Sequence, residues 1–387
     1  MVIGTMGLEF GSGNKGCEAL GFSFFYLLNQ IAVEKKEMVD VKICMRCDTT
    51  RIINKLKCNN LRLSCVSMGR IMEISYKKKI FKECDLVYDF TSGDSFSDIY
   101  GLKRFLRWTM NKQAALWVRT SLILGSQTYG PYKSQFAKIW ARHIIRHSDY
   151  VYARDDLSCE IAKMLSGRND IYKTVDVAFA LPYDKQQFQF PKNDKIRVGI
   201  NPSGLLWAGG YKGNNQFSLR LDYKKYCIGL IRRLIRKNKY EIYLIPHVIY
   251  KDLSLADNDI VACNELKKKF SNTIYAPLFD TPMEAKGYIS NMDIFIGARM
   301  HATIAAFTSG VATIPVSYSR KFEGLYNSLD YPYVISGTKI ATEDAILETL
   351  QYVEDYKELE KIIKSRDGII RKEVERLLDF MRKDIKM

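Results

Sequence analysis

Apolar residues along the chain follow two alternating spacings. Short apolar runs typical of buried strands are separated by longer segments in which apolar residues recur every three or four positions, as in helices. In the first half we expect strands at 39–46, 86–90, 121–127, 150–154 and 174–181. Between them we expect helices at 18–32, 102–119, 133–147 and 157–165. This alternation predicts a parallel sheet with crossover helices.

A polar, proline-bounded stretch at 182–194 interrupts the alternation, and we interpret it as a linker. The second series has predicted strands at 196–200, 241–246, 273–276, 294–297 and 313–316. Its predicted helices are 223–237, 259–270, 283–291 and 301–307. We therefore predict an α/β protein with two Rossmann-like domains, at 1–182 and 195–341, and C-terminal helices at 342–387 that pack back across the domains.

The composition narrows the class of protein. The net charge of +16 predicts an anionic partner, but charge alone leaves phosphorylated substrates, nucleic acids and acidic membrane faces open. The first residues lack the pattern of a signal peptide, and no uncharged apolar run approaches 18 residues, so we expect a cytoplasmic protein. Nine cysteines fit reduced thiols. Cys44 and Cys47 form one C-x-x-C without a second pair, which favours buried thiols over a metal site.

A glycine-rich loop lies near the start of the chain. Gly11, Gly13 and Gly16 satisfy G-x-G-x-x-G ahead of a predicted helix, where backbone amides can bind an anion. A dinucleotide site would also need a clear preceding strand and an acidic residue about 20 positions later, and Asp48 lies too far downstream. A phosphorylated or carboxylated ligand, a plain glycine turn and NAD binding remain open, in that order.

The strongest catalytic candidates follow the predicted strand at 294–297. Arg299 offers a planar fork for a carboxylate or phosphate, and His301 titrates near neutrality, at the strand end where doubly wound sheets hold ligands. Other candidates follow neighbouring strands: Asn201 and Ser203, which could form a phosphate nest, His247, which could assist the chemistry, and Tyr318, Arg320 and Lys321.

Nine segments occur in the order seen in a known family. They begin at Gly13, Ser92, Gln127, Ala153, Asp176, Gly199, Ile245, Gly297 and Tyr318, and read GNKGCEAL, SGDSFSD, QTYGP, ARD, DVAF, GINPSG, IPH, GARMH and YSRK. In this order the chain resembles the polysaccharide pyruvyl transferases over residues 13–336. It departs from the common pattern at Cys17, where many members have Asp, and at Thr91 and Ser92, where many have Gly.

The resemblance implies a fold similar to B-type glycosyltransferases, phosphoenolpyruvate as co-substrate and no other cofactor. It implies donor binding or acid/base roles for Arg299 and His301. We expect Asn14, Gly16 and Tyr318 to face the acceptor. Asp94 could orient acceptor hydroxyls or cap a helix, and Arg154 could contact the donor or pair with neighbouring carboxylates.

The implied acceptor is a sugar or lipid-linked oligosaccharide of a capsule or exopolysaccharide, which would bring the enzyme to the inner face of the membrane. Two alternatives stay open. A nucleotide-sugar glycosyltransferase would share the architecture, with Glu323 as the candidate ribose ligand. A non-catalytic polyanion-binding protein would use the basic surface, although no nucleic-acid-binding motif is present and we expect no nucleic acid partner.

Overall fold

A computed structural model describes residues 1–45, 47–70 and 73–385, without the side chains of Arg320 and Lys321. These residues form two compact units. The first unit comprises Met1–Gly11, Leu20–Leu181 and the chain from Arg371 onward, and the second comprises Ser12–Ala19 and Pro182–Ile370. The glycine loop from Ser12 onward, which we placed in the first domain, groups with the second unit. The C-terminal helices, which we expected to pack across the domains, are divided between the units at Arg371.

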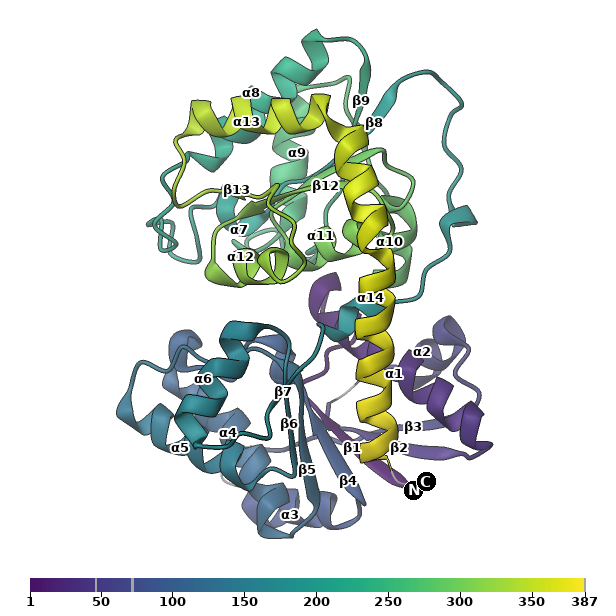
Figure 1. Cartoon of the computed structure of the whole chain (residues 1–387), viewed down its shortest axis with the longest axis vertical. Helices are drawn as coiled ribbons and strands as arrows, with labels where there is room; N and C mark the ends of the chain where they lie inside the picture. Colours follow the sequence, from purple (N-terminus) through teal and green to yellow (C-terminus); the bar gives the residue numbers. More distant parts are fainter. Residues whose placement is uncertain (46, 71–72, 386–387) are drawn as a thin grey trace. The chain divides into compact units, whose positions relative to one another are not determined.

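The first unit contains a seven-stranded parallel sheet with the order β3-β2-β1-β4-β5-β6-β7 (Figure 1). Its strands are β1 (Val2–Met6), β2 (Val39–Ile43), β3 (Leu61–Cys65), β4 (Leu86–Asp89), β5 (Ser121–Gln127), β6 (Tyr150–Ala153) and β7 (Tyr172–Lys173). The strand order reverses direction between β1 and β4. In a doubly wound sheet the ligand crevice lies outside the carboxyl ends of the strands at such a reversal.

Helices cover both faces of this sheet. They are α1 (Lys15–Lys35), which begins in the second unit, and α2 (Thr49–Leu56), α3 (Ile74–Lys82), α4 (Leu102–Trp117), α5 (Gln135–His147) and α6 (Asp156–Ser166). One core cluster joins α3 to α6 to the sheet, with a buried residue from each helix: Phe81, Phe105, Ala141 and Ala162. These four helices therefore form one layer.

The second unit contains a six-stranded parallel sheet with the order β10-β9-β8-β11-β12-β13. Its strands are β8 (Ile196–Asn201), β9 (Tyr240–Leu244), β10 (Ile274–Tyr275), β11 (Ile294–Gly297), β12 (Ala312–Ser317) and β13 (Ile335–Ser336). The order reverses between β8 and β11, whose ends are paired through Asn201 and Gly297. Both sheets thus follow the doubly wound topology.

The helices of the second unit also form two layers. They are α7 (Gly204–Trp207), α8 (Tyr223–Arg236), α9 (Asp259–Lys269), α10 (Pro282–Ile289), α11 (Met300–Phe307), α12 (Arg320–Asn327), α13 (Thr342–Glu354) and α14 (Tyr356–Asp384), which continues into the first unit. Residues of α8, α9 and α13 share one core cluster with the sheet. Residues of α10 and α11 share another. The predicted α/β fold with two parallel sheets is confirmed.

The secondary structure differs from the prediction at a few elements. The strand predicted at 174–181 is wrong, because β7 ends at Lys173 and Val177–Ala180 form a 3-10 helix. The Asp176 side chain starts that helix by accepting a hydrogen bond from the Ala178 amide at 2.9 Å. The prediction also missed β3, since a mostly exposed edge strand lacks the apolar run of a buried one. It dismissed β1 as a poor strand, although four of its five residues are buried.

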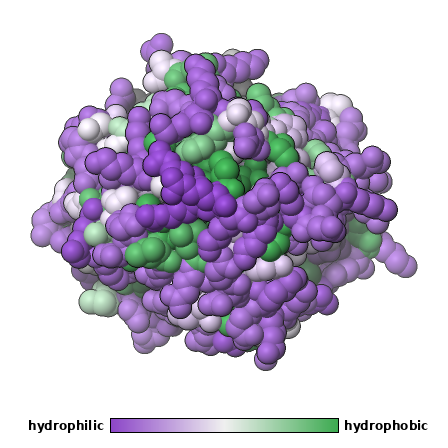
Figure 2. All heavy atoms as spheres, turned by 90° about the horizontal axis from the view of Figure 1, so that it is seen from above, coloured by the Kyte–Doolittle hydropathy of each residue, from purple (hydrophilic) through white to green (hydrophobic). Residues whose placement is uncertain are grey.

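The surface is largely polar, in keeping with the charge of the chain. The face seen in Figure 2 is mostly hydrophilic, with hydrophobic side chains gathered near its centre. Within residues 1–45, 47–70 and 73–385, no helix has the length and apolarity needed to cross a bilayer.

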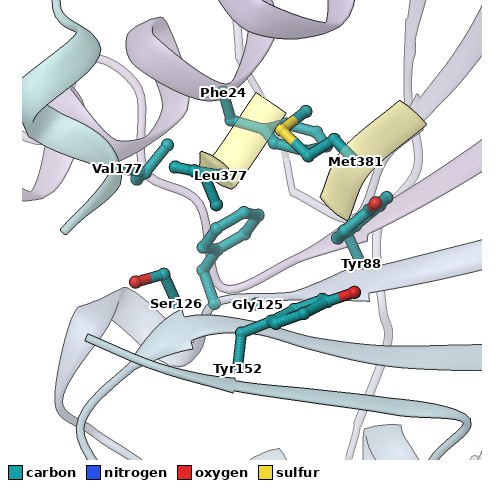
Figure 3. A pocket seen from close by; sticks show the side chains of 9 residues that line it. Phe24, Tyr88, Gly125, Ser126, Tyr152, Val177, Leu377 and Met381 are labelled. Atoms are coloured by element: carbon teal, nitrogen blue, oxygen red, sulfur yellow. The ribbon is translucent and has the colours of Figure 1, made fainter. Parts of the chain in front are cut away.

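The end of α14 carries a buried carboxylate in the first unit. Asp384 accepts hydrogen bonds from the hydroxyls of Tyr88 and Tyr152, at 2.9 and 2.7 Å. Leu377 and Met381 of the same helix line a small space with these tyrosines (Figure 3). Burial raises the pKa of Asp384 to about 6. In the folded protein, this carboxyl therefore holds its proton to a higher pH than in the unfolded chain.

This raised pKa predicts a pH-dependent stability. The folded state binds the Asp384 proton more tightly than the unfolded state, so the free energy of unfolding should fall as pH rises from about 4 to above 6. Asp384→Asn should lack this dependence, and its advantage over the wild type should grow by about 1 kcal/mol between pH 5 and 7.5. Urea unfolding at both pH values measures the free energy of unfolding of each protein. Asp379→Asn, at an exposed carboxylate of the same helix, is the control. A constant difference between Asp384→Asn and wild type would contradict the assignment.

Candidate functional site

The carboxyl ends of β8, β9 and β11 converge on one buried carboxylate, that of Asp259 at the start of α9. Its side chain is fully buried. One oxygen, Oδ1, accepts hydrogen bonds from the Gly204 amide at 2.7 Å and from Nε and Nη2 of Arg299 at 3.1 and 2.7 Å. This oxygen therefore joins the segment after β8 to the turn after β11.

The second oxygen of Asp259 holds the segment after β9. Oδ2 accepts hydrogen bonds from the amides of His247 and Val248, at 3.0 and 2.9 Å, and from Nδ2 of Asn201 at 3.2 Å. Six donors thus converge on one carboxylate, which offsets the cost of burying its charge. We call this cluster of Asp259, Arg299 and Asn201 the Asp259 hub.

The guanidinium of Arg299 is directed into the hub. Besides the contacts with Asp259, its Nη1 lies 2.5 Å from Oδ1 of Asp257 and its Nη2 donates to the Asp257 carbonyl at 2.8 Å. Burial alone would lower the pKa of Arg299, but the carboxylates of Asp259 and Asp257 raise it well above its usual range. The Arg299 guanidinium therefore makes four hydrogen bonds, all of them to Asp257 and Asp259.

Two histidines flank the hub. His247 follows β9 and is buried. Burial, together with the charges of His301, Arg299 and Lys15, lowers the pKa of His247 well below its usual value, so this imidazole is neutral near pH 7. His301 is the second residue of α11, and the side chain of Arg299 before it makes no capping hydrogen bond to the helix.

The glycine loop lies against these histidines. A Cβ atom added to Gly16 would come within 2.8 Å of Nδ1 of His301, so only glycine allows this approach. The amide of Lys15 donates to the His247 carbonyl at 3.1 Å, and Asn14 forms a bridge with Val248. The loop and both histidines thus belong to one constellation within the second unit.

The loop is held by its own polar groups. Oδ1 of Asn14 accepts hydrogen bonds from the amides of Gly16 and Cys17, at 3.0 and 3.2 Å, and so caps α1. The buried Glu18 carboxylate accepts from the Gly13 amide at 2.9 Å and pairs with Nζ of Lys15 at 3.1 Å. These contacts fix the loop and do not test the acceptor role expected for Asn14 and Gly16.

The remaining candidates of the second unit have mixed placements. Asn201 is buried, and its Oδ1 accepts from the Arg299 amide at 3.1 Å. Ser203 caps α7 by accepting from the Leu206 amide at 3.4 Å. Tyr318 follows β12 and packs on Phe217, with ring centroids 4.9 Å apart. Arg320 and Lys321 begin α12, but their side chains lie outside the described part of the structure.

Two candidates lie in the first unit, with the loop after β4. Nη1 of Arg154 pairs with Asp176 at 3.0 Å, and Oδ2 of Asp94 accepts from the Tyr100 hydroxyl at 2.9 Å. Within the second unit, the structure gathers Asn201, His247, Arg299, His301 and the glycine loop from Ser12 onward into one cluster, whereas Asp94 and Arg154 belong to the first unit.

The loop after β4 has an unusual backbone. Thr91, Ser92 and Gly93 have successive φ angles of 41°, 50° and 80°, a left-handed conformation that costs about 1 kcal/mol or more for each residue with a Cβ. The Thr91 hydroxyl donates to Asp89 and accepts from Nζ of the buried Lys112, both at 2.6 Å. These two hydrogen bonds stabilise a turn that glycine could adopt through its greater conformational freedom.

Among the described residues, no group of three or more His, Cys, Asp or Glu side chains is placed to hold a metal ion. Cys44 and Cys47 of the C-x-x-C are both partly buried, and burial raises the pKa of both thiols. Sγ of Cys47 lies 3.0 Å from Sγ of Cys65. All nine cysteines are free thiols.

The sequence did not lead us to Asp257 and Asp259, the two acidic residues that bind the Arg299 guanidinium. Asp257 and Asp259 precede a helical pattern, where acidic residues ordinarily serve as helix caps. We also overlooked Lys15 and Glu18 as a buried pair. The pattern Asp-Asn-Asp about ten residues after Ile-Pro-His was the available signal, because two acids near a strand end can pair with the arginine of a neighbouring strand.

The fold is shared with solved structures of sugar-nucleotide enzymes. The UDP-GlcNAc 2-epimerase of Neisseria meningitidis bound to UDP-GlcNAc matches with a TM-score of 0.57 and 12% identity, over 97% of this chain and 100% of that one. The trehalose 6-phosphate synthase of Burkholderia multivorans matches with a TM-score of 0.58 and 7% identity, over 99% and 97%. At these identities the likeness shows the fold alone, which is that of B-type glycosyltransferases and epimerases.

The sequence gives a more specific relationship. Residues 14–320 match the family described as polysaccharide pyruvyl transferase, a range that contains Asn14 and Gly16 of the glycine loop, both histidines and the Asp259 hub. The match covers well over half of the chain, and therefore this protein belongs to the polysaccharide pyruvyl transferase family.

Proposed function

We propose that this protein transfers pyruvate from phosphoenolpyruvate to two hydroxyls of a sugar in surface polysaccharide biosynthesis, forming a ketal. The observation that carries the proposal is the convergence of His301, His247 and the glycine loop beside the Asp259 hub. The cluster combines the neutral imidazole of His247, the imidazole of His301 at the start of α11 and the backbone of the glycine loop, which approaches His301 closely. It lies at the strand ends where this topology holds ligands.

The reaction needs a proton donor and acceptors for protons. The methylene carbon of phosphoenolpyruvate gains one proton, the neighbouring carbon bonds to two sugar oxygens, and the bond to phosphate breaks. Each hydroxyl loses its proton, so two protons leave the acceptor: one is consumed at the methylene carbon, which becomes the methyl group, and the other is taken up by the departing phosphate. We assign the proton transfer to His301 and an assisting role to His247, whose neutral ring can accept a proton or a hydrogen bond.

The start of α11 is the proposed binding place for the donor's phosphate or carboxylate. Its first-turn amides donate no hydrogen bond to the side chain of Arg299, which has no acceptor, and the helix dipole favours an anion. Arg320 and Lys321, which begin α12, are close in sequence to the end of β12 and remain proposed ligands of the donor. Asn14, Gly16, Asp94 and Tyr318 remain proposed contacts of the acceptor.

The contacts of Arg299 favour an indirect role. Its guanidinium pairs with Asp257 and Asp259, so we propose that it positions the turn carrying His301 instead of clamping the donor directly. The contacts of Asn201, Ser203 and Arg154 favour similar supporting roles. This revision matters for mutagenesis, because removing Arg299 would leave the buried Asp259 and the partly buried Asp257 without their cation and would destabilise the protein.

A nucleotide-sugar glycosyltransferase is the second candidate, because the similar structures include enzymes solved with UDP-GlcNAc. The proposed ribose ligand, Glu323, accepts a hydrogen bond from Ser336 at 2.7 Å and pairs with Lys339 at 3.0 Å. These contacts occupy the carboxylate and favour the pyruvyl transferase.

Ligand binding separates these candidates. Calorimetric titrations of the purified protein with phosphoenolpyruvate, UDP and NAD should show saturable binding of phosphoenolpyruvate alone. Binding of UDP instead would support the glycosyltransferase, and failure of phosphoenolpyruvate to bind would contradict the proposal. A positive result would justify a screen of sugar acceptors by release of inorganic phosphate.

Removal of the His301 imidazole should abolish most of the chemistry. We expect His301→Ala to lower turnover about 10²–10⁴-fold, the usual contribution of a positioned proton-transfer group, while binding of phosphoenolpyruvate changes much less. Phosphate release in the presence of acceptor measures turnover, and calorimetry measures binding. Near-wild-type turnover by folded His301→Ala would refute the assignment.

A methyl group at position 16 should displace the His301 ring. In Gly16→Ala, the new Cβ would lie 2.8 Å from Nδ1 of His301, and we expect turnover to fall at least tenfold with a smaller change in thermal stability. Gly368→Ala is the matched control, because its Cβ would meet no atom within 4 Å. Equal turnover of the two variants would show that the approach of the loop to His301 is not needed for catalysis.

A further inference from the structure

The first unit contains a strongly basic stretch that the proposed site does not use. Positions 99–148 hold nine lysine or arginine residues and no aspartate or glutamate, although the whole chain has 43 acidic residues in 387 positions. Three of the four tryptophans, Trp108, Trp117 and Trp140, also lie there. Much of the stretch forms α4 and α5, neighbours in the layer of helices on one face of the first sheet (Figure 1).

The N-terminal ends of α4 and α5 are joined by one side chain. Asp98 accepts hydrogen bonds from the amides of Lys133 and Ser134, both at 2.8 Å, and from the Ser134 hydroxyl at 2.9 Å. Ser134 in turn caps α5. The residues that directly follow Asp98 are therefore held beside the first turn of α5, and the Asp98 carboxylate at this junction accepts hydrogen bonds from three donors.

Large apolar side chains are exposed at this junction. Ile139 is 67% exposed, Leu102 51%, Phe136 45% and Tyr100 37%. Trp140 packs on Phe136, with ring centroids 6.2 Å apart. We call the surface formed by these five residues the α4–α5 face.

The α5 helix presents opposite properties on its two sides. Its buried residues, Ala137, Ala141, Ile144 and Ile145, pack into the core of the first unit. Its exposed side combines Phe136 and Ile139 with Arg142 and Arg146. On α4, Lys103, Arg104 and Arg107 are likewise exposed, and Arg104 lies over the Tyr100 ring at 5.2 Å. Both helices thus expose cations together with apolar side chains.

We propose that the α4–α5 face binds the surface of an anionic phospholipid bilayer. Apolar side chains of a surface helix enter the boundary between headgroups and acyl chains, while lysine and arginine contact the phosphates. Charge complementarity favours this partner, since the stretch carries only positive charge. The aliphatic Ile139 and Leu102 argue against single-stranded nucleic acid, which such surfaces bind by stacking bases on aromatic rings.

Vesicle sedimentation with the full chain tests the proposal. The protein should bind vesicles of phosphatidylcholine with about one third phosphatidylglycerol, but not vesicles of phosphatidylcholine alone. Because the contacts are partly electrostatic, binding should weaken when salt is raised from about 0.1 to about 0.5 M. Equal binding to both vesicles, or to neither, would overturn the proposal.

Two matched variants test whether the α4–α5 face is the surface that binds the vesicles. Ile139→Glu should weaken binding to the anionic vesicles at least tenfold, whereas Leu347→Glu, at a residue 55% exposed on α13, should leave it within twofold. Both positions are exposed on helices, so folding should be retained. Equal affinities of the two variants would contradict the location.

Two further measurements identify the partner. Brominated lipids should quench the tryptophan fluorescence of the wild type, and Trp140→Phe should lose part of this quenching, because Trp140 packs on Phe136 at the inserting surface. A DNA oligonucleotide of equal phosphate concentration should compete poorly for the protein. Complete displacement from the vesicles by DNA would instead identify a nucleic-acid surface. Ile139→Glu should still bind phosphoenolpyruvate, so a loss of vesicle binding by this variant tests the membrane surface independently of the proposed function.

Discussion

The carboxylate of Asp259 fixes the geometry on which the candidate site depends. Three strands of the second sheet end in segments whose amides and side chains donate to its two oxygens. A buried carboxylate cannot lose several of these donors cheaply, because its charge would then face a medium of low polarity. The positions of His247 and of the Arg299 turn are therefore linked through one side chain that need not touch a substrate.

The glycine loop adds a constraint from the other end of the chain. It precedes most of the first sheet in sequence, yet Ser12–Ala19 groups with the second unit through contacts with His247, Val248 and His301. Its conformation is set by Asn14 and Glu18, which satisfy amides within the loop. The site is thus built from a sheet edge and a distant loop, each held by its own buried polar groups.

The fold could be predicted from the sequence because apolar periodicity reports burial directly. Most buried strands of both sheets and most long helices follow this rule, while the exposed edge strand β3 and the buried strand β1 were not predicted. The site was harder to predict. His301 and Arg299 stood out as polar residues after a buried strand, but the direction of the Arg299 guanidinium depends on Asp257 and Asp259, some forty residues away in the chain. Such pairings follow from tertiary structure, which local patterns do not encode.

The hydrogen bonds of the Thr91 hydroxyl restrict which residues relatives of this protein can have around this turn. The Thr91 hydroxyl links Asp89 to the ammonium of Lys112, which lies fully buried in α4. A relative with glycine at position 91 gains backbone freedom but loses that link, which leaves the buried ammonium of Lys112 to its direct ion pair with Asp89, at 3.2 Å. Positions 89 and 112 should therefore evolve together in such relatives, because losing either charge alone would leave the other buried without its partner.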